Sequence, residues 1–369
     1  MRAVFAGGGS AGHLSPSVAI AQRFLRLAAD PEVLFFGAQR DLDRNILAPY
    51  PHQLLPATGL PYGFSLQTVI SLARMAGAGM QALGALRRFG PAVFVGTGGY
   101  VTAASAPAAG MLKVPCVLHA SDALPDRTTL KLAKMAHTVT VAFEAAAQYF
   151  PADKVVVTGQ PVREEFLTGD RESARAELGY QPDDIVFFVT GGSQGAQRLN
   201  DATLDAAAQL LMEGLKILHQ TGQGDYERVR QLATDSGLIG DENAYRCLPF
   251  DPELGRLLAA ADVILMRAGA SSLAEASAWG VPMVLVPYPY AHGHQKHNAQ
   301  ALVDRGAALT IEDADLTPEA MAESVLGLAA DKARRGAMSQ AASDWGSREA
   351  AERIARLALA AAEGCQSPA

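Results

Sequence analysis

The chain has few cysteines and no excess of positive charge. Its 369 residues include three cysteines, Cys116, Cys247 and Cys365, which show neither CxxC spacing nor the spacing of a Cys/His metal site. An odd cysteine count in a chain of this length does not indicate a disulfide framework, so we expect a reducing compartment. A net charge of −7 and a pI of about 5.6 leave no basic field for nucleic acid, so we expect no such partner.

A long, uninterrupted hydrophobic run is also missing. Residues 66–86 come nearest, but Arg74 and Gln81 interrupt them, so we do not expect a spanning helix. The segment could instead lie on a membrane, with Arg74, Arg87 and Arg88 meeting anionic headgroups. Its apolar surface would come from Leu66, Ile70, Leu72, Met75, Met80, Leu83 and Leu86. A helix that packs on its own sheet fits the composition equally well.

The sequence does contain two glycine-rich loops, about half a chain apart. The first spans residues 7–13 after the apolar residues 3–5, and the second spans 191–196 after 185–189. An apolar, helix-like segment follows each loop. A glycine turn at the carboxyl end of a parallel strand favours phosphate-like anions, because the N–H groups and the positive end of the next helix point into it. The sequence therefore predicts two halves of similar structure, with the two glycine loops facing each other across a cleft.

Strand-like and helix-like segments alternate along both halves. In the first half the predicted strands are 3–6, 33–36, 93–95, 116–119, 138–141 and 155–157. In the second half they are 185–189, 216–219, 245–248, 263–266, 283–286 and 308–311. Repeated strand–helix–strand units predict a parallel sheet with helices on both faces and right-handed crossovers. The expected fold class is α/β, with two doubly wound, Rossmann-like domains.

The turn-rich residues 159–161 mark the expected join between the domains. We expect an N-terminal domain over residues 1–160 and a C-terminal domain over 161–344, in line with the length of the chain. Residues 345–362 have apolar side chains at helical spacing, and this helix is expected to pack back on the N-terminal domain. The chain runs from Met1 straight into a strand and a glycine loop, which leaves no room for a signal peptide.

The second half carries three motifs suited to a nucleotide sugar. Residues 191–196 offer backbone N–H groups beside the Ser193 hydroxyl. Glu275 follows a strand and a glycine turn, where a carboxylate can accept both ribose hydroxyls or can simply complement the helix dipole. Gln295 and Asn298 stand three residues apart, so on a helix they share a face and can bond sugar hydroxyls.

The sequence gives little support for a metal or a redox cofactor. The histidines His292, His294 and His297 invite a zinc site, but no cysteine or carboxylate stands at ligand spacing beside them, so we expect no metal. Neither glycine loop reads GxGxxG with an acidic residue about twenty positions further on, which argues against a nicotinamide oxidoreductase. We therefore expect no cofactor.

Taken in order, these motifs resemble the MurG family of peptidoglycan N-acetylglucosaminyltransferases. In the second half the matching segments read Gly-Gly-Ser-Gln-Gly-Ala at 191–196, Gly-Ala-Ser-Ser-Leu-Ala-Glu at 269–275 and His-Gln-x-x-Asn-Ala at 294–299. In the first half they are the loop at 7–13, Gly-Thr-Gly-Gly-Tyr-Val at 96–101 and Gly-Gln-Pro-Val-Arg at 159–163. The resemblance spans nearly the whole chain, and the ordered set is far more specific than any single loop.

The resemblance implies an inverting, metal-independent glycosyltransferase of the GT-B type. Such an enzyme would move N-acetylglucosamine from UDP-GlcNAc to lipid I, the undecaprenyl-diphosphate-linked muramoyl-pentapeptide, and so form lipid II for peptidoglycan. It would work as a peripheral protein on the cytoplasmic face of the cell membrane. Residues 66–88 would lie on the anionic membrane surface.

Matching positions also imply site residues. Donor binding would involve Arg163, Ser193, Gln194, Gly195, Arg267, Glu275, His294, Gln295 and Asn298. Within this set Ser193 and Arg163 would hold the diphosphate, and Glu275 would hold the ribose. Gln295 and Asn298 would bind the sugar end of the donor. Arg267 would support the part of the site that binds the sugar. The acceptor diphosphate would lie against Gly9, Ser10, Ala11, Gly12, Gly98, Gly99 and Tyr100.

His13, at the exit of the first loop, is the candidate general base. An inverting transfer needs the acceptor hydroxyl to lose its proton as it attacks the anomeric carbon. His13 could instead orient a phosphate or bond the backbone. Departure of UDP would be assisted by Ser193, Arg163 and a helix start, so the chemistry does not require a metal.

One segment departs from the family pattern. The family usually reads His-Glu-Gln-Asn, then Pro-Gly and an asparagine, whereas this chain has His119, Ala120, Ser121 and Asp122, then Pro125, Asp126 and Thr129. We interpret the change as a structural substitution without a change of function, although the departure by itself favours a related transferase with another acceptor. It also leaves the acceptor open, and it makes Asp122 and Asp126 further candidate bases.

Other functions stay open on the residues alone. A related GT-B transferase that uses a UDP-sugar but a different lipid or small-molecule acceptor would keep the second half and alter residues 119–129. A UDP-sugar 2-epimerase of the same fold would need more acids and bases around the sugar and no lipid-facing surface, which residues 66–88 argue against. A non-catalytic subunit would bind the donor without transferring it.

Overall fold

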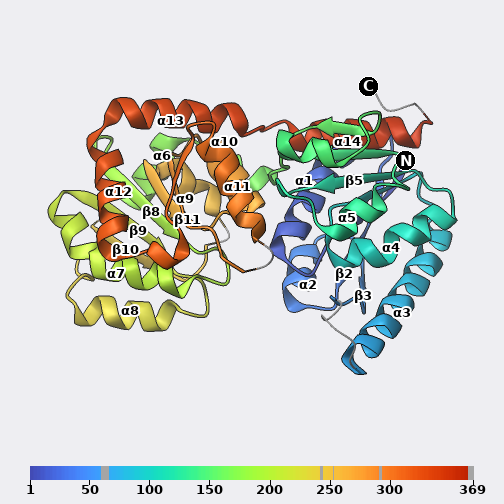
Figure 1. The fold of residues 1–369 in the computed structure, drawn as a ribbon, viewed down its shortest axis with the longest axis horizontal. Coiled ribbons are helices and arrows are strands. Elements are labelled where there is room, and N and C mark those ends of the chain that lie inside the picture. Colours follow the sequence, from blue (N-terminus) through green and yellow to red (C-terminus); the bar gives the residue numbers. More distant parts are fainter. Residues whose placement is uncertain (60–65, 242–243, 252, 291–292, 365–369) are drawn as a thin grey trace. The chain divides into compact units, whose positions relative to one another are not determined.

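The computed structural model describes residues 1–59, 66–241, 244–251, 253–290 and 293–364 (Figure 1). The chain divides into two units. Unit 1 comprises Met1–Arg163 with Arg348–Ala369, and unit 2 comprises Glu164–Ser347. Each unit is built on one parallel sheet with helices on both faces, which confirms the predicted fold class.

Unit 1 contains a seven-stranded sheet with the order β3-β2-β1-β4-β5-β6-β7, and every neighbouring pair is parallel. The strands are β1 (Arg2–Ala6), β2 (Glu32–Ala38), β3 (His52–Leu55), β4 (Val93–Gly96), β5 (Cys116–Ala120), β6 (Thr138–Val141) and β7 (Val155–Val157). The central strands are apolar along their whole length because helices bury both faces. Val4 therefore packs into one core and its neighbour Phe5 into the other.

The helices of unit 1 fill these two cores. They are α1 (Ala11–Leu27), α2 (Asp41–Leu47), α3 (Leu66–Phe89), α4 (Gly99–Met111), α5 (Arg127–Leu132), the 3-10 helix η1 (Glu144–Tyr149) and α14 (Ala350–Ala362). On one face α3 and α4 bury Ala82 and Val101 against Phe94. On the other face α1 and α14 bury Phe24 and Ile354 against the sheet.

The last helix starts later than the sequence pattern predicts. Trp345 ends α13 (Lys332–Trp345) in unit 2, and α14 begins only at Ala350. Gly346 caps α13 with an extended backbone, φ −72° and ψ 94°, so one continuous helix from residue 345 is wrong. The small buried residues Ala355 and Ala358 allow α14 to pack closely on α1.

Unit 2 repeats the design with a six-stranded parallel sheet of order β10-β9-β8-β11-β12-β13. Its strands are β8 (Ile185–Thr190), β9 (Leu215–Gln220), β10 (Tyr245–Leu248), β11 (Val263–Met266), β12 (Met283–Leu285) and β13 (Ala308–Thr310). Its helices, with α13, are η2 (Glu164–Phe166), α6 (Arg171–Leu178), α7 (Gln197–Met212), α8 (Tyr226–Asp235), α9 (Leu254–Ala260), α10 (Ala270–Ala278), α11 (His294–Val303), η4 (Asp313–Asp315) and α12 (Pro318–Ala330).

The strand order reverses once in each sheet, between β1 and β4 in unit 1 and between β8 and β11 in unit 2. At such a point the chain leaves neighbouring strands toward opposite faces, which opens a crevice at their carboxyl ends where doubly wound proteins bind ligands. All four connections at these points are the glycine-containing segments that the sequence singled out. The topology therefore places the predicted loops where a ligand would bind in each unit.

The helix α3 runs along one edge of unit 1 (Figure 1). Residues Gln67–Phe89 are long and apolar enough to cross a membrane by length and composition, and 28% of the apolar window is buried. Leu86 lies in the core, so its expected place on an apolar surface is wrong. The exposed apolar side chains of α3 are Val69, Ile70, Leu72 and Met80. The side chain of Leu66 lies outside the described residues.

Candidate functional site

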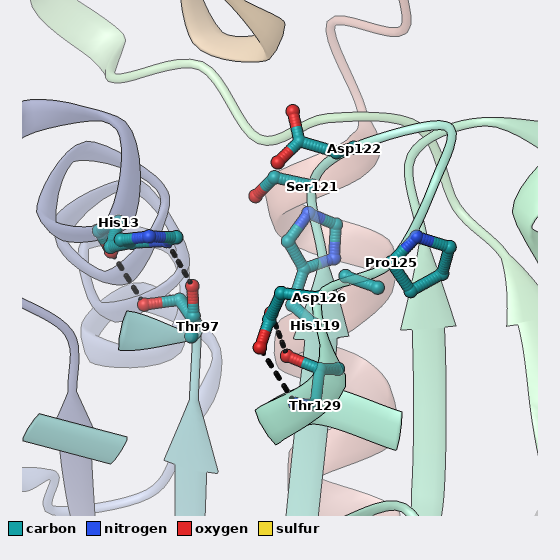
Figure 2. A pocket seen from close by; sticks show the side chains of 10 residues that line it. His13, Thr97, His119, Ser121, Asp122, Pro125, Asp126 and Thr129 are labelled. Carbon is teal, nitrogen blue, oxygen red and sulfur yellow. Dashed lines mark hydrogen bonds between the residues drawn. The ribbon is translucent and has the colours of Figure 1, made fainter. Parts of the chain in front are cut away.

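His13 lies in the first turn of α1, beside the start of α4. Its Nδ1 atom is 3.3 Å from the carbonyl oxygen of Thr97, and the Thr97 hydroxyl donates to the His13 carbonyl oxygen at 2.6 Å (Figure 2). A carbonyl oxygen only accepts, so in the neutral ring Nδ1 carries the proton. Nε2 is then the nitrogen that can accept one.

The glycine loop before α4 makes room for this imidazole. Gly98 and Gly99 have φ values of +95° and +74°. A Cβ atom at Gly98 would lie 2.9 Å from the Nδ1 atom of His13, and one at Gly99 would lie 3.0 Å from its Cδ2 atom. Side chains here would displace the imidazole, so the glycines and His13 form one structural element.

The first glycine loop is held from behind by a buried carboxylate. Asp43 is fully buried, and its Oδ2 atom accepts from the N–H groups of Gly9 at 3.1 Å and Ala38 at 2.7 Å. The Arg40 guanidinium donates to the carbonyl oxygen of Gly9. Both peptide groups of Gly9 are therefore engaged by the protein, and its contribution to a phosphate site is the shape of the loop.

His119 lies at the end of β5 and is 1% exposed. Its Nε2 atom is 2.8 Å from Gln160 Oε1 and its Nδ1 atom is 2.9 Å from Thr140 Oγ1. Burial lowers the pKa of His119 to about 4, so the ring is neutral and both of its nitrogens are engaged by hydrogen bonds. This pair of bonds ties the segment at residues 159–163 to the sheet of unit 1.

A small pocket joins His13 to the segment that departs from the family pattern (Figure 2). Figure 2 shows Asp122 beside Ser121 at one end of this segment and Asp126 beside Thr129 at the other. Asp126 is the N-cap of α5. Its Oδ1 atom accepts from the N–H groups of Thr128 at 2.7 Å and Thr129 at 3.0 Å, and its Oδ2 atom from the Thr129 hydroxyl at 2.6 Å. Asp126 is thus occupied in holding α5, whereas Asp122 is half-buried at the pocket.

In unit 2 the loop after β8 closes on the loop after β9. The Gly192 N–H donates to the Thr190 hydroxyl at 3.0 Å, and the Gly195 N–H donates to the Gly192 carbonyl oxygen at 3.0 Å. Gly195 has a φ of +77°, and a Cβ atom there would lie 2.2 Å from the carbonyl oxygen of Thr221. This close approach requires glycine. It leaves Ser193 half-buried and Gln194 exposed on the loop.

Gln295 and Asn298 both bind the peptide of Ala268, in the turn between β11 and α10. Gln295 Oε1 accepts from the Ala268 N–H at 3.0 Å and from the Tyr288 N–H at 2.9 Å. Asn298 Nδ2 donates to the Ala268 carbonyl oxygen at 3.2 Å, and Asn298 is fully buried. The two amides therefore share a face of α11, as their spacing predicts, and together they fix the turn.

The side chain of Arg267 is fixed in the same way. Its Nη1 atom donates to Asp313 Oδ1 at 2.6 Å and to the Val286 carbonyl oxygen at 3.1 Å, and its guanidinium lies over the Tyr288 ring. Glu275 is 6% exposed in the second turn of α10. A helix dipole acts mainly within the first turn, so complementing the dipole does not account for this buried carboxylate.

The other expected site residues come from both units. His294 is the first residue of α11, and Arg163 is the last residue of the main segment of unit 1; both are half-buried. Ser10 is the N-cap of α1, followed by Ala11 and Gly12 in its first turn. Among the described residues, no group of three or more His, Cys, Asp or Glu side chains could hold a metal ion. His292 lies outside the described residues.

Comparison with known proteins decides the family. Residues 3–141 match the glycosyltransferase family 28 N-terminal domain and residues 186–354 the glycosyltransferase family 28 C-terminal domain. The UDP-N-acetylglucosamine–N-acetylmuramyl-(pentapeptide) pyrophosphoryl-undecaprenol N-acetylglucosamine transferase of Desulforudis audaxviator is 38% identical over 362 residues, which cover 96% of each chain. The crystal structure of Acinetobacter baumannii MurG superposes with a TM-score of 0.73 at 25% identity, covering 97% of this chain and 99% of that one. The chain belongs to the MurG family.

Membership in the MurG family confirms the resemblance read from the motifs and the GT-B fold with its two Rossmann-like domains. The chain is a UDP-GlcNAc-dependent hexosyltransferase of this family. A UDP-GlcNAc 2-epimerase from Neisseria meningitidis also superposes, with a TM-score of 0.68 at 16% identity, covering 97% of this chain and all of that one. At that identity the likeness concerns the fold alone.

Several residues near the candidate site have no role among the sequence predictions, although Thr97 and His119 lie within the quoted motifs. They are Arg40, Asp43, Thr97 and His119. His119 and Thr97 could have been found from their places at the ends of predicted strands, where site residues of parallel sheets gather. Asp43 had no such signal, because a carboxylate at the start of a helix usually serves as a surface charge.

Proposed function

We propose that the chain transfers N-acetylglucosamine from UDP-GlcNAc to lipid I and releases lipid II and UDP. The observation that carries the proposal is the 38% identity over 96% of both chains to a transferase named for this reaction. The acceptor hydroxyl attacks the anomeric carbon from the face opposite the diphosphate, and the bond to UDP breaks. The sugar therefore changes its anomeric configuration.

The donor belongs to unit 2 in this proposal. The loop at residues 191–196 and the Ser193 hydroxyl receive the diphosphate, with Gln194 and Gly195 shaping the loop and Arg163 adding positive charge. The buried Glu275 accepts from the ribose hydroxyls. His294 and the amide nitrogen of Gln295 serve the sugar end of the donor. Arg267 and the buried Asn298 act indirectly, because their hydrogen bonds hold the backbone next to the residues that bind the sugar.

His13 is the general base that we assign to the reaction. Its Nδ1 atom faces the Thr97 carbonyl oxygen, so Nε2 is available to take the proton of the attacking hydroxyl. Asp122 at the same pocket is the second candidate. Asp126 is the weakest of the three, because hydrogen bonds within α5 engage both of its carboxylate oxygens.

The acceptor belongs to unit 1. Ser10, Ala11 and Gly12 lie at the start of α1, and Gly98, Gly99 and Tyr100 at the start of α4, so both segments direct helix N-termini toward an acceptor diphosphate. The exposed apolar side chains of α3, with Arg87 and Arg88, lie on the anionic, cytoplasmic surface of the membrane. The protein is then a peripheral membrane enzyme that meets its lipid-linked acceptor there.

The test measures UDP release from UDP-GlcNAc with and without a short-chain lipid I analogue, in detergent. We expect release only with the analogue, and an equal rate after EDTA is added, because residues rather than a metal stabilise the leaving diphosphate. Donor binding without release would point to another acceptor and to the altered segment at residues 119–129. Release that EDTA abolishes would overturn the metal-independent chemistry.

A further inference from the structure

A cavity of about 480 Å³ in unit 1 has no role in the proposal so far. Its lining comes from four segments: residues 39–40 after β2, residues 56–59 after β3, Arg74 of α3 and Tyr100 of α4. It adjoins the first glycine loop, since the Arg40 guanidinium donates to the Gly9 carbonyl oxygen and bonds the Tyr100 hydroxyl. The cavity therefore lies beside the expected place of the acceptor diphosphate.

The cavity is positively charged although the chain as a whole is acidic. The described residues that line it include two arginines, Arg40 and Arg74, and no carboxylate. Within the described part of the chain, Arg74 makes no hydrogen bond or ion pair, and Arg40 bonds only neutral oxygens. The nearby Asp43 is fully buried and already accepts two backbone N–H groups through Oδ2. Two guanidinium groups therefore face the cavity, and none of the described residues that line it is a carboxylate that could neutralise them.

The other groups in the lining suit a phosphate. Gln39, Thr58 and Tyr100 offer an amide and two hydroxyls that can donate to phosphate oxygens. Guanidinium groups bind phosphates with two parallel hydrogen bonds, which an ammonium group cannot match. A diphosphate has two anionic centres, and the helix starts of α1 and α4 next to the cavity can accept only part of that charge.

We propose that Arg40 and Arg74 bind the lipid-side phosphate of the acceptor's diphosphate, while the glycine loops bind the sugar-side phosphate. This inference rests on the proposed function. It adds two cationic residues to the acceptor site and gives the diphosphate an orientation. Arg40 also acts as a positioning residue, because it holds the Gly9 peptide.

The surroundings of Arg74 indicate which phosphate of the diphosphate lies in the cavity. Ile70 lies one helical turn before Arg74 on α3, and Val69 and Leu72 are also exposed there. A hydrocarbon chain that leaves the cavity at Arg74 therefore meets exposed apolar side chains, whereas the residues that line the His13 pocket are a separate set. An amphiphile that places its phosphate between the two arginines would place its hydrocarbon chain against the exposed apolar side chains of α3.

Arg74→Gln is the sharpest test, because Arg74 makes no hydrogen bond or ion pair with the described residues that the substitution would break. Steady-state kinetics with the short-chain lipid I analogue, in neutral detergent without anionic lipid, should show the acceptor KM raised about tenfold or more. The KM for UDP-GlcNAc should change less than about twofold. Arg74→Lys should recover part of the lost acceptor affinity, since lysine keeps the charge but not the planar group that makes two parallel hydrogen bonds. Lys134→Gln, which removes an exposed charge outside the cavity, is the matched control.

A second measurement probes the phosphate directly. Geranyl diphosphate, a diphosphate on a short hydrocarbon, should inhibit competitively against the acceptor, and Arg74→Gln should weaken that inhibition in parallel with the rise in KM. An acceptor KM equal to that of Lys134→Gln would overturn the proposal. An effect seen only on vesicles with anionic phospholipid would also overturn it and assign Arg74 to a lipid headgroup. Failure of the proposed function itself looks different, because the unsubstituted protein would then release no UDP with the analogue.

Discussion

Glu275 is the residue to which we assign the ribose of the donor. It is 6% exposed in the second turn of α10, beside the turn that Gln295 and Asn298 fix. In the proposed function this carboxylate accepts from the ribose hydroxyls of the donor.

We expect Glu275→Gln to weaken UDP binding about tenfold to a hundredfold, because hydrogen bonds to a charged group contribute about 1.5 to 3 kcal/mol. Isothermal titration calorimetry with UDP measures the dissociation constant. Glu323→Gln, at an exposed position on α12, serves as the control. Equal affinities of the two variants would remove Glu275 from the donor site.

The role that we propose for His13 depends on the hydrogen bond of its Nδ1 atom. Since Nδ1 faces the Thr97 carbonyl oxygen, only Nε2 can take a proton from the acceptor. We expect His13→Gln to lower kcat by about a hundredfold or more and to leave the dissociation constant of UDP-GlcNAc nearly unchanged, as a general base acts on the chemical step.

Steady-state kinetics and donor titration on the same preparation separate these two effects. Thr97→Val, which removes the hydroxyl bond to the His13 backbone but leaves the imidazole, should give a smaller loss of kcat. A variant at His13 that loses donor affinity but keeps kcat would contradict the assignment of the residue to the acceptor side.

At the scale of the element, α5 shows why a change from a family pattern need not change a reaction. Asp126 and Thr129 stand where the family usually has glycine and asparagine, and in the structure they bond each other and the helix start. The two substitutions therefore make a local N-cap that needs no substrate.

We expect Asp126→Asn to keep nearly full activity, because asparagine is as good an N-cap as aspartate. Asp126→Ala should lower the free energy of unfolding by about 1 kcal/mol, through loss of the cap. Urea unfolding and the UDP-release assay, run on both variants, give the two readouts. Loss of turnover in a stable Asp126→Asn protein would instead make Asp126 the base.

Elements also differ in how well the sequence foretold them. The strand β1 was expected at 3–6 and spans Arg2–Ala6, because its apolar residues fill both cores. The strand β3 was missed. It is an edge strand of four residues, of which His52, Gln53 and Leu54 are only half-buried, so the apolar run that marks a parallel strand is absent from its sequence.

At the scale of the whole molecule, each unit buries one neutral histidine among its described residues. Burial lowers the pKa of His119 in unit 1 to about 4 and that of His219 in unit 2 to about 3. His219 lies between the Tyr245 hydroxyl and the Asn200 amide oxygen, so it is fully bonded without a charge. In an unfolded chain both would titrate near the usual histidine pKa of about 6.5.

We therefore expect stability to fall with acidification below about pH 6.5. The unfolded chain then binds protons that the native protein does not, and each histidine lowers the free energy of unfolding by up to about 1.4 kcal/mol per pH unit until its native pKa is reached. Urea midpoints at pH 7.5 and 5.5 measure this loss, in a window where carboxylates stay ionised. His119→Gln should reduce the difference, and identical midpoints at both pH values would contradict the prediction.

The sequence alone determined the two-fold α/β design, the family and the glycine loops, because continuous apolar strands and glycine turns are local signals that the chain must carry to form parallel sheets. Tertiary structure decided which groups meet. Strand order brought the loops to the switch points, and packing placed Asp43 behind Gly9, turned Asn298 inward and gathered Arg40 with Arg74 in one cavity. Those contacts join residues distant in sequence, so no local pattern could specify them.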